Sequence, residues 1–272
     1  MTKKLRVYLP FAQNEIKRQM SYKGAFYIFI FISLFGSFIS YYIWMAVYGS
    51  AKSGSIGGLS RSEMIIYVFM VYVTSSMVTI SIADWISEDI VKGTVSMNLI
   101  KPIDYRTSLM SRAFGDVIYR FLLPGVFIWG AVEIYKVVSL KTSVTSFQQI
   151  FFYLLSCFMS FLIYVLFDFC FGMIAFFTTY IFGLMLAKSA LLSFLTGQLI
   201  PLSFFPEGAQ KVFDFLPFSS MVYTPVMIYL GKYQGNQLIL VLLRQLFWVI
   251  VLYGIGSLVW RKVTKHLVVL GG

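Results

Sequence analysis

The chain has 272 residues, of which 59% are hydrophobic and only 12% are charged, and its formal net charge is +11. Soluble domains carry roughly 25% charged residues because their surface must be solvated by water. With about half that share, much of this surface must face lipid. The composition therefore excludes a soluble enzyme or a soluble binding domain.

The positive charge does not indicate a nucleic-acid partner. Lys and Arg stand at the ends of the apolar runs, where membrane anchors and topology signals occur. A helical span takes about 20 apolar residues, so six spans use about half of the chain. We expect one all-α transmembrane domain over 1–272, surrounded by membrane lipids, with no nucleic-acid partner.

The first element is a polar and basic segment, 1–24. Pro10 could occupy the first turn of a helix whose apolar stripe runs through Ala12, Ile16 and Met20. We expect an amphipathic helix that lies in the membrane interface with its basic face toward the lipid headgroups. A disordered basic start is the alternative.

Apolar runs then predict a six-helix bundle over 25–260. Pro124 predicts a kink in the third span, and residues 178–188 are the expected turn between spans four and five. Three prolines make 206–237 an irregular outer segment, and 261–272 is a basic tail. The six spans are expected at 25–48, 63–82, 108–135, two within 147–205, and 238–260.

Orientation follows from the uneven distribution of Lys and Arg. Most of them lie in the N-terminal segment, in 84–112 and in the tail, and the positive-inside rule places such segments in the cytoplasm. We therefore expect both termini to be cytoplasmic, in the plasma or inner membrane of a bacterium. The opposite loops hold Lys52, Arg61, Lys136, Lys141, Lys211 and Lys232.

The sequence carries no pattern for catalysis, a cofactor or a metal. His266 is its only histidine and lies in the basic tail, while Cys157 and Cys170 are expected to be packing residues. No phosphate-binding P-loop is present, since Gly231-Lys232 lacks the required spacing and following residue. Any use of ATP and Mg²⁺ therefore requires a separate ATPase.

The segment 84–102 has the densest pattern of charge and helix signals. Asp84 or Ser87 could cap a short helix at its N-terminus. Ile86 and Ile90 are four residues apart and lie on one face of that helix. This pattern predicts a compact helix on the cytoplasmic side, between spans two and three, with an ordinary interfacial loop as the alternative.

The same segment also shows where this short helix should end. Gly93 suits the position after the last helical turn. A second short turn through Val95 and Leu99 would end at Pro102. The two turns together predict a small charged knob on the cytoplasmic face.

Four ionisable residues fall within expected spans, where burial of a charge costs at least a few kcal/mol. Asp116 and Arg120 are four residues apart and are expected to neutralise each other. Asp168 could pair with Arg244, or either could line a pore. Arg244 could instead reach outward to the membrane surface.

The knob resembles the cytoplasmic coupling segment of ABC-2-type transporter permeases, which consists of an acidic helix, Gly-Thr, a leucine and a proline. The matching residues are Glu88, Gly93, Thr94, Leu99 and Pro102.

A second resemblance lies in 197–206 and the prolines after it. This stretch is similar to the family's Gly-x-x-Ile-Pro-Leu-x-x-Phe-Pro stretch, where the fifth span re-enters the outer leaflet. Its fixed points here are Gly197, Pro201 and Pro206, with Pro217 following. The two stretches occur in order on a six-span frame, and the resemblance covers essentially the whole chain.

The resemblance implies a permease subunit of an ATP-driven exporter, paired with a second permease and two copies of a cytoplasmic ATPase. Ile86 and Ile90 would supply the apolar contact with the ATPase, and Glu88 and Asp89 would set its register. One rival is an ATP-independent secondary transporter or channel, which would use Asp116 or Asp168. A membrane-embedded enzyme is a further rival that lacks a nucleophile and a base.

Overall fold

The computed structural model describes the chain except residues 1–2, 22, 52–53, 179–181 and 271–272. It is almost entirely helical, as expected from the sequence. The helices in chain order are α1 (Lys3–Ser21), α2 (Lys23–Ser50), α3 (Arg61–Val78), α4 (Ile82–Val91), α5 (Thr94–Leu99), α6 (Tyr105–Arg120), α7 (Val126–Val138), α8 (Phe147–Gly172), α9 (Phe182–Leu195), α10 (Glu207–Phe215), α11 (Tyr223–Tyr229) and α12 (Gly235–Leu270). Single turns η1 (Phe121–Gly125), η2 (Met173–Phe176) and η3 (Leu202–Phe204) link some of them.

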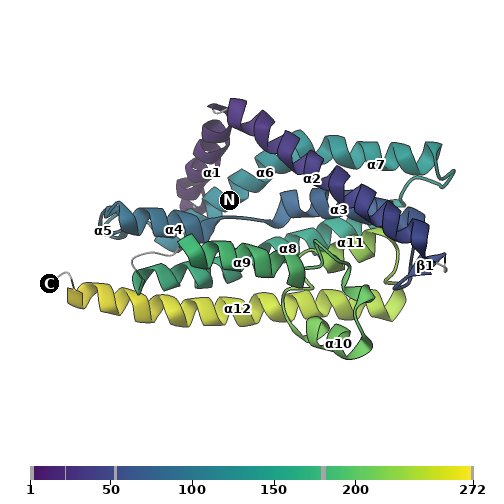
Figure 1. Cartoon of the computed structure of the whole chain (residues 1–272). Coiled ribbons are helices and arrows are strands. Elements are labelled where there is room, and N and C mark those ends of the chain that lie inside the picture. Colours follow the sequence, from purple (N-terminus) through teal and green to yellow (C-terminus); the bar gives the residue numbers. More distant parts are fainter. Residues whose placement is uncertain (1–2, 22, 52–53, 179–181, 271–272) are drawn as a thin grey trace.

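The long helices run roughly side by side, and the molecule has two distinct ends (Figure 1). We call the end with α5 and the C-terminal end of α12 the knob end. At the opposite, hairpin end, β1 (Ser55–Ile56) pairs antiparallel with β2 (Leu59–Ser60). Helix α8 packs against α3, α4, α11 and α12, so it forms the centre of the core.

Three helical segments of the described chain are long and apolar enough to cross a membrane. They are Tyr105–Val138, Phe147–Phe176 and Gly235–Thr264. Helices α3 and α4 would make a fourth span, bent by 43° at the break between them. The length and apolar composition of these helices identify the chain as a membrane protein.

Two further helices, α2 and α9, lie where the sequence predicts the first and fifth of the six membrane spans. Helix α2 has 28 residues, which corresponds to about 42 Å at 1.5 Å per residue. Helix α9 is apolar but has only 14 residues.

Several expected boundaries are wrong. Helix α1 begins at Lys3 and contains Pro10 in its interior, and Met20 of the expected apolar stripe is exposed. Helix α9 begins at Phe182, so Lys188 belongs to a helix and not to the turn. The irregular segment 206–237 contains α10 and α11. The tail continues α12 as far as Leu270.

Pro124 breaks the third span in a specific way. The prediction of a kink placed the disturbance correctly, because residues Phe121–Gly125 form a π-helical turn between α6 and α7. Proline has no backbone N–H and its ring clashes with the preceding turn. A locally widened turn accommodates both effects within one long helix.

Candidate functional site

The N-terminus of α4 is capped by a side chain from a distant helix. Ser81 occupies the cap position but makes no side-chain cap hydrogen bond. The backbone N–H of Ala83 donates instead to a carboxylate oxygen of Asp168 in α8, at 2.8 Å. The expected caps, Asp84 and Ser87, lie within the helix, so that expectation was wrong.

The apolar face of α4 packs against the chain's own core. Ile86 is completely buried, and Ile90 is partly buried against the same core. A Cβ built on Gly172 of α8 would lie 2.9 Å from both the Cα of Ala83 and the Cδ1 of Ile86. Helices α4 and α8 therefore interlock closely. The expectation that Ile86 and Ile90 face a partner is wrong for Ile86.

The C-terminus of α4 agrees with the sequence. Lys92 is the C-cap residue of α4. Gly93 follows it with a φ of +69°, a conformation that favours glycine. Glu88 is exposed and forms an ion pair with Lys92 at 2.5 Å. The predicted contact of Glu88 with a partner stays a prediction.

Asp89 organises the knob from within. Its carboxylate accepts hydrogen bonds from the hydroxyl of Thr94 at 2.8 Å, the hydroxyl of Tyr105 at 2.8 Å and the amide of Asn98 at 3.2 Å. These bonds join α4, α5 and the start of α6. Asp89 thus fixes the shape of the knob, and its expected role as a partner contact finds no support in this geometry.

The exposed tip of the knob is apolar. The side chains of Val91, Met97 and Ile100 are 74%, 63% and 83% exposed. Sequence reasoning missed these residues, although Val91 is five positions after Ile86 and so lies off the buried face. Pro102 follows the tip and is exposed, whereas the side chain of Leu99 lies outside the described part of the chain.

Helix α1 is fastened to α6 by a polar cluster. The side chain of Glu15 is 2% exposed and accepts hydrogen bonds from Arg18 at 3.0 Å and Arg112 at 2.8 Å. Burial opposes the charged form, but the two guanidinium groups hold the pKa of Glu15 below its ordinary value. The guanidinium of Arg112 also lies 4.0 Å from the ring centroid of Trp85 in α4, which connects this cluster to the knob.

Asp116 and Arg120 form the expected ion pair. Asp116 also accepts a hydrogen bond from the amide of Gln19 in α1 at 2.7 Å. Arg120 donates to the backbone carbonyl of Thr79 at 2.5 Å, and Thr79 caps the C-terminus of α3. The pair therefore supports the bend between α3 and α4.

Asp168 and Arg244 have separate partners, so of the alternatives that the sequence left open the pair between them does not form. Asp168 forms an ion pair with Lys188 of α9 at 2.5 Å. Arg244 forms one with Asp214 of α10 at 2.9 Å, and its second nitrogen donates to Thr224 at 3.4 Å. Arg244 thus fastens α12 to the short helices of the outer segment.

The stretch 197–206, the second one that resembles the family, follows the end of α9 and turns the chain away from that helix. Gly197 has a φ of +80°, and its carbonyl accepts a hydrogen bond from Tyr67 at 2.6 Å. Pro201 immediately precedes η3, and Pro206 caps α10. Pro217 opens the next turn, where its carbonyl accepts from the N–H of Ser220 at 3.2 Å.

Two hollows accompany these features. A groove of about 410 Å³ lies between α2, α3 and the C-terminal end of α9. Its polar lining consists of Ser37, Ser40, Tyr67, Tyr72, Ser75, Ser193 and Gln198.

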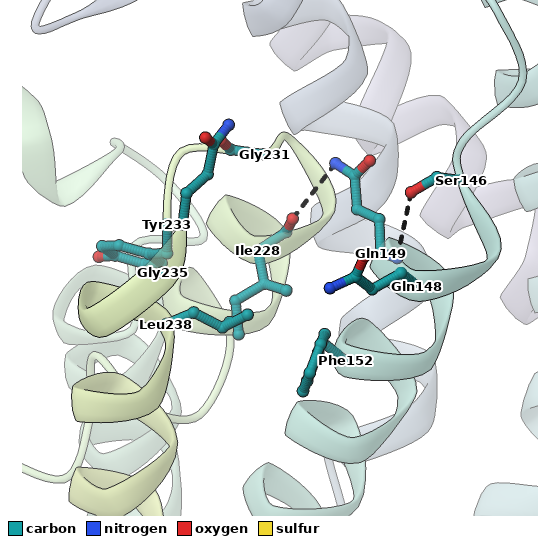
Figure 2. A pocket seen from close by; sticks show the side chains of 10 residues that line it. Ser146, Gln148, Gln149, Phe152, Ile228, Gly231, Tyr233, Gly235 and Leu238 are labelled. Carbon is teal, nitrogen blue, oxygen red and sulfur yellow. Dashed lines mark hydrogen bonds between the residues drawn. The ribbon is translucent and has the colours of Figure 1, made fainter.

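The second hollow lies at the hairpin end, with a volume of about 320 Å³, between the start of α8 and the turn before α12 (Figure 2). There the amide of Gln149 donates to the carbonyl of Tyr229 at 2.6 Å and to that of Ile228 at 3.4 Å. These bonds satisfy the carbonyl groups at the end of α11.

The described residues contain no group of three or more His, Cys, Asp or Glu residues that could hold a metal ion. Cys157 and Cys170 are free thiols in that part of the chain. The fold and these contacts define a helical membrane protein with a capped, internally hydrogen-bonded knob at one end of its bundle.

The profile of the ABC-2 family transporter proteins matches residues 31–271. The chain therefore belongs to the ABC-2 family of transporter proteins, which confirms the family that the sequence resembles. No curated protein sequence matches this chain.

Proposed function

We propose that the chain is the permease subunit of an ATP-driven exporter, forms half of the translocation path, and couples to a separate cytoplasmic ATPase. Membership of the ABC-2 family supports transport. The chain has no P-loop, so ATP and Mg²⁺ would bind to the partner. In this proposal the knob end faces the cytoplasm, and α2 and α9 complete six spans.

The observation that carries the proposal is the apolar tip of a rigid knob. Val91, Met97 and Ile100 are highly exposed beside the ion pair of Glu88 and Lys92. Exposed apolar residues with a charged rim are typical of protein interfaces. A rigid knob also transmits force, because its internal bonds to Asp89 keep α4 and α5 together.

We assign the groove between α2, α3 and α9 to the translocation path, completed by a second permease. Polar side chains within a membrane span are costly where they face lipid. A path between two subunits would cover the hydroxyl groups of Ser40 and Ser193. An identical and a different second subunit would serve equally in this role.

The ATP-independent rival receives less support. A secondary transporter needs ionisable residues that are free to bind a coupling ion near the middle of the membrane. Asp116 and Asp168 already have cationic partners and accept further hydrogen bonds. Their geometry favours structural roles within the permease.

The test changes an exposed residue of the tip and measures how much ATPase co-purifies with the protein. We expect Ile100→Glu to reduce the co-purified ATPase at least about tenfold, because a buried carboxylate would replace an apolar contact. The full chain is purified from its native membrane, P-loop proteins are quantified by mass spectrometry, and ATP hydrolysis is measured with and without vanadate.

The matched control is Val144→Glu, which changes an exposed apolar residue outside the knob and should retain the ATPase. Full retention of the ATPase by Ile100→Glu would show that the tip is not the docking site. Absence of any ATPase from the unaltered protein would refute the exporter proposal itself.

A further inference from the structure

One buried carboxylate joins three helices next to the knob. Asp168 lies in α8 and is 0% exposed, and its two oxygens have different partners. One accepts the backbone N–H of Ala83 in α4 at 2.8 Å, and the other accepts the ammonium group of Lys188 in α9 at 2.5 Å. Lys188 is itself buried, with 7% of its side chain exposed. This is the most deeply buried ion pair among the described residues.

Helix α9 has few other anchors. Lys188 and Leu192 are the only residues of α9 that are buried within the described structure. Most of the other large apolar side chains of this helix are exposed, and Leu186 and Leu191 are examples. The ion pair is therefore the main polar attachment of α9 to the bundle.

The contact between α4 and α8, next to Asp168, is tightly packed. Helices α4 and α8 interlock at Gly172, where a side chain would overlap the backbone of Ala83. A displacement of α4 must therefore move the knob-end half of α8 or break the hydrogen bond to Asp168. In the first case the carboxylate that holds Lys188 moves with α8, and in the second case it loses one of its two partners.

Helix α9 also forms one wall of the groove. Ser193 lies five residues after Lys188 and lines the groove together with residues of α2 and α3. Five residues of helix span about 7.5 Å, so the junction and the groove wall lie on one short rigid element. A continuous path of contacts thus runs from the knob through Asp168 and Lys188 to the groove.

Packing alone does not account for this arrangement. Two charges buried in a bundle are often no more stabilising than apolar residues of the same size. We infer that Asp168 and Lys188 are a positioning pair that transmits movement of the knob to α9 and so changes the groove. This inference rests on the proposed function, because the movement would come from the ATPase.

The key variant removes both charges together. In Asp168→Asn/Lys188→Met the amide oxygen of Asn can still accept the N–H of Ala83, so the cap of α4 is retained. No unpaired charge remains, and we expect assembly and ATPase binding to stay within about twofold of the unaltered protein. The single changes, which each leave one buried charge without its partner, should lower the amount of assembled protein.

The first measurement does not depend on the ATPase. A spin label is placed at Ala190 in α9, in a background without Cys157 and Cys170, and its mobility is compared between proteins. We expect the double variant to increase this mobility. The control Glu63→Gln/Lys232→Met removes an ion pair of 2.7 Å that does not involve α9, and it should leave the mobility unchanged. Unchanged mobility in both double variants overturns the inference.

The second measurement tests whether nucleotide changes the distance between α2 and α9. A second label at Ile39 in α2 gives the distance between α2 and α9, measured without nucleotide and after trapping with ATP and vanadate. The unaltered protein and the control should show a change in this distance, and the Asp168→Asn/Lys188→Met variant should lose it. A full distance change in that variant means that the pair only packs, and the inference fails.

The exporter proposal has its own outcome. If no ATPase associates with the unaltered protein, the proposed function fails and the transmission role fails with it. The mobility measurement would still report whether the pair anchors α9, so the two failures are distinguishable.

Discussion

Gly93 shows how a single residue sets the geometry of the knob. Its φ of +69° ends α4 and redirects the chain into α5. A Cβ at this position would meet no atom within 4 Å, so only the backbone conformation requires glycine. The position therefore separates backbone strain from steric overlap.

We expect Gly93→Val to tilt α5 and weaken ATPase coupling while the protein still accumulates in the membrane. A β-branched residue in this conformation is strained by about 1 kcal/mol or more. The matched control is Gly93→Asn, since Asn tolerates the same conformation and should retain most of the coupling. ATP hydrolysis by the purified complex measures the difference. Equal loss in both variants would show that the conformation of Gly93 is not the cause.

At the scale of elements, α1 packs closely against α6. A Cβ on Gly115 of α6 would lie 2.3 Å from the carbonyl oxygen of Ala12, so the two helices meet at backbone contact. Glu15 adds ion pairs to Arg18 and Arg112 at the same interface. A movement of α6 should therefore carry α1 with it.

Glu15→Gln should lower the stability of the protein near neutral pH, and the difference should disappear in acid. The two arginines depress the pKa of Glu15 in the folded protein. Its stabilisation is thus present above the unfolded pKa of about 4.3 and is lost as pH falls through the lower, folded pKa. We expect a loss of about 1.5–3 kcal/mol, the range for hydrogen bonds to charged groups.

Thermal unfolding in detergent, followed from neutral to acidic pH, measures this difference. Glu207→Gln, which changes an exposed glutamate in α10, serves as the control and should follow the unaltered protein at every pH. A Glu15→Gln protein that is equally destabilised at all pH values would contradict a role for its charge.

At the scale of the whole molecule, the proposed orientation places the hairpin end outside the cell. Single cysteines at Ser55 and Asn236, in a background without Cys157 and Cys170, should react with an impermeant thiol reagent in intact cells. Cysteines at Lys101 and Lys262 should react only after the membrane is opened. Labelling of the second pair in intact cells would reverse the orientation.

The sequence could predict features that depend on neighbours along the chain. The pair of Asp116 and Arg120, the turn at Gly93 and the break at Pro124 all follow from spacings of a few residues or from one residue's backbone. Lys188 and Asp168 are 20 residues apart and Ala83 is 85 residues from Asp168, so their junction depends on tertiary packing.

Periodicity also has a physical limit at the knob. It identified the apolar face that carries Ile86, but an apolar face can be covered by a partner or by the chain's own core. Helix α8 covers it here, and the apolar side chains that stay exposed on the knob include Met97 and Ile100. The family resemblance assigned this face to a partner, but Ile86 on it is buried within the chain itself.

Helix α12 sets the position of the knob relative to the membrane surface. From Gly235 to Trp260 it has 26 residues, or about 39 Å, which exceeds the roughly 30 Å of a hydrocarbon core. The ring of Tyr105 at the base of the knob stacks on Trp260, with centroids 5.9 Å apart. Tryptophan prefers the level of the lipid headgroups. A thicker or thinner bilayer would therefore tilt α12 or shift the knob relative to the membrane surface, and the acyl-chain length of the surrounding lipid becomes a determinant of how well a peripheral partner can reach it.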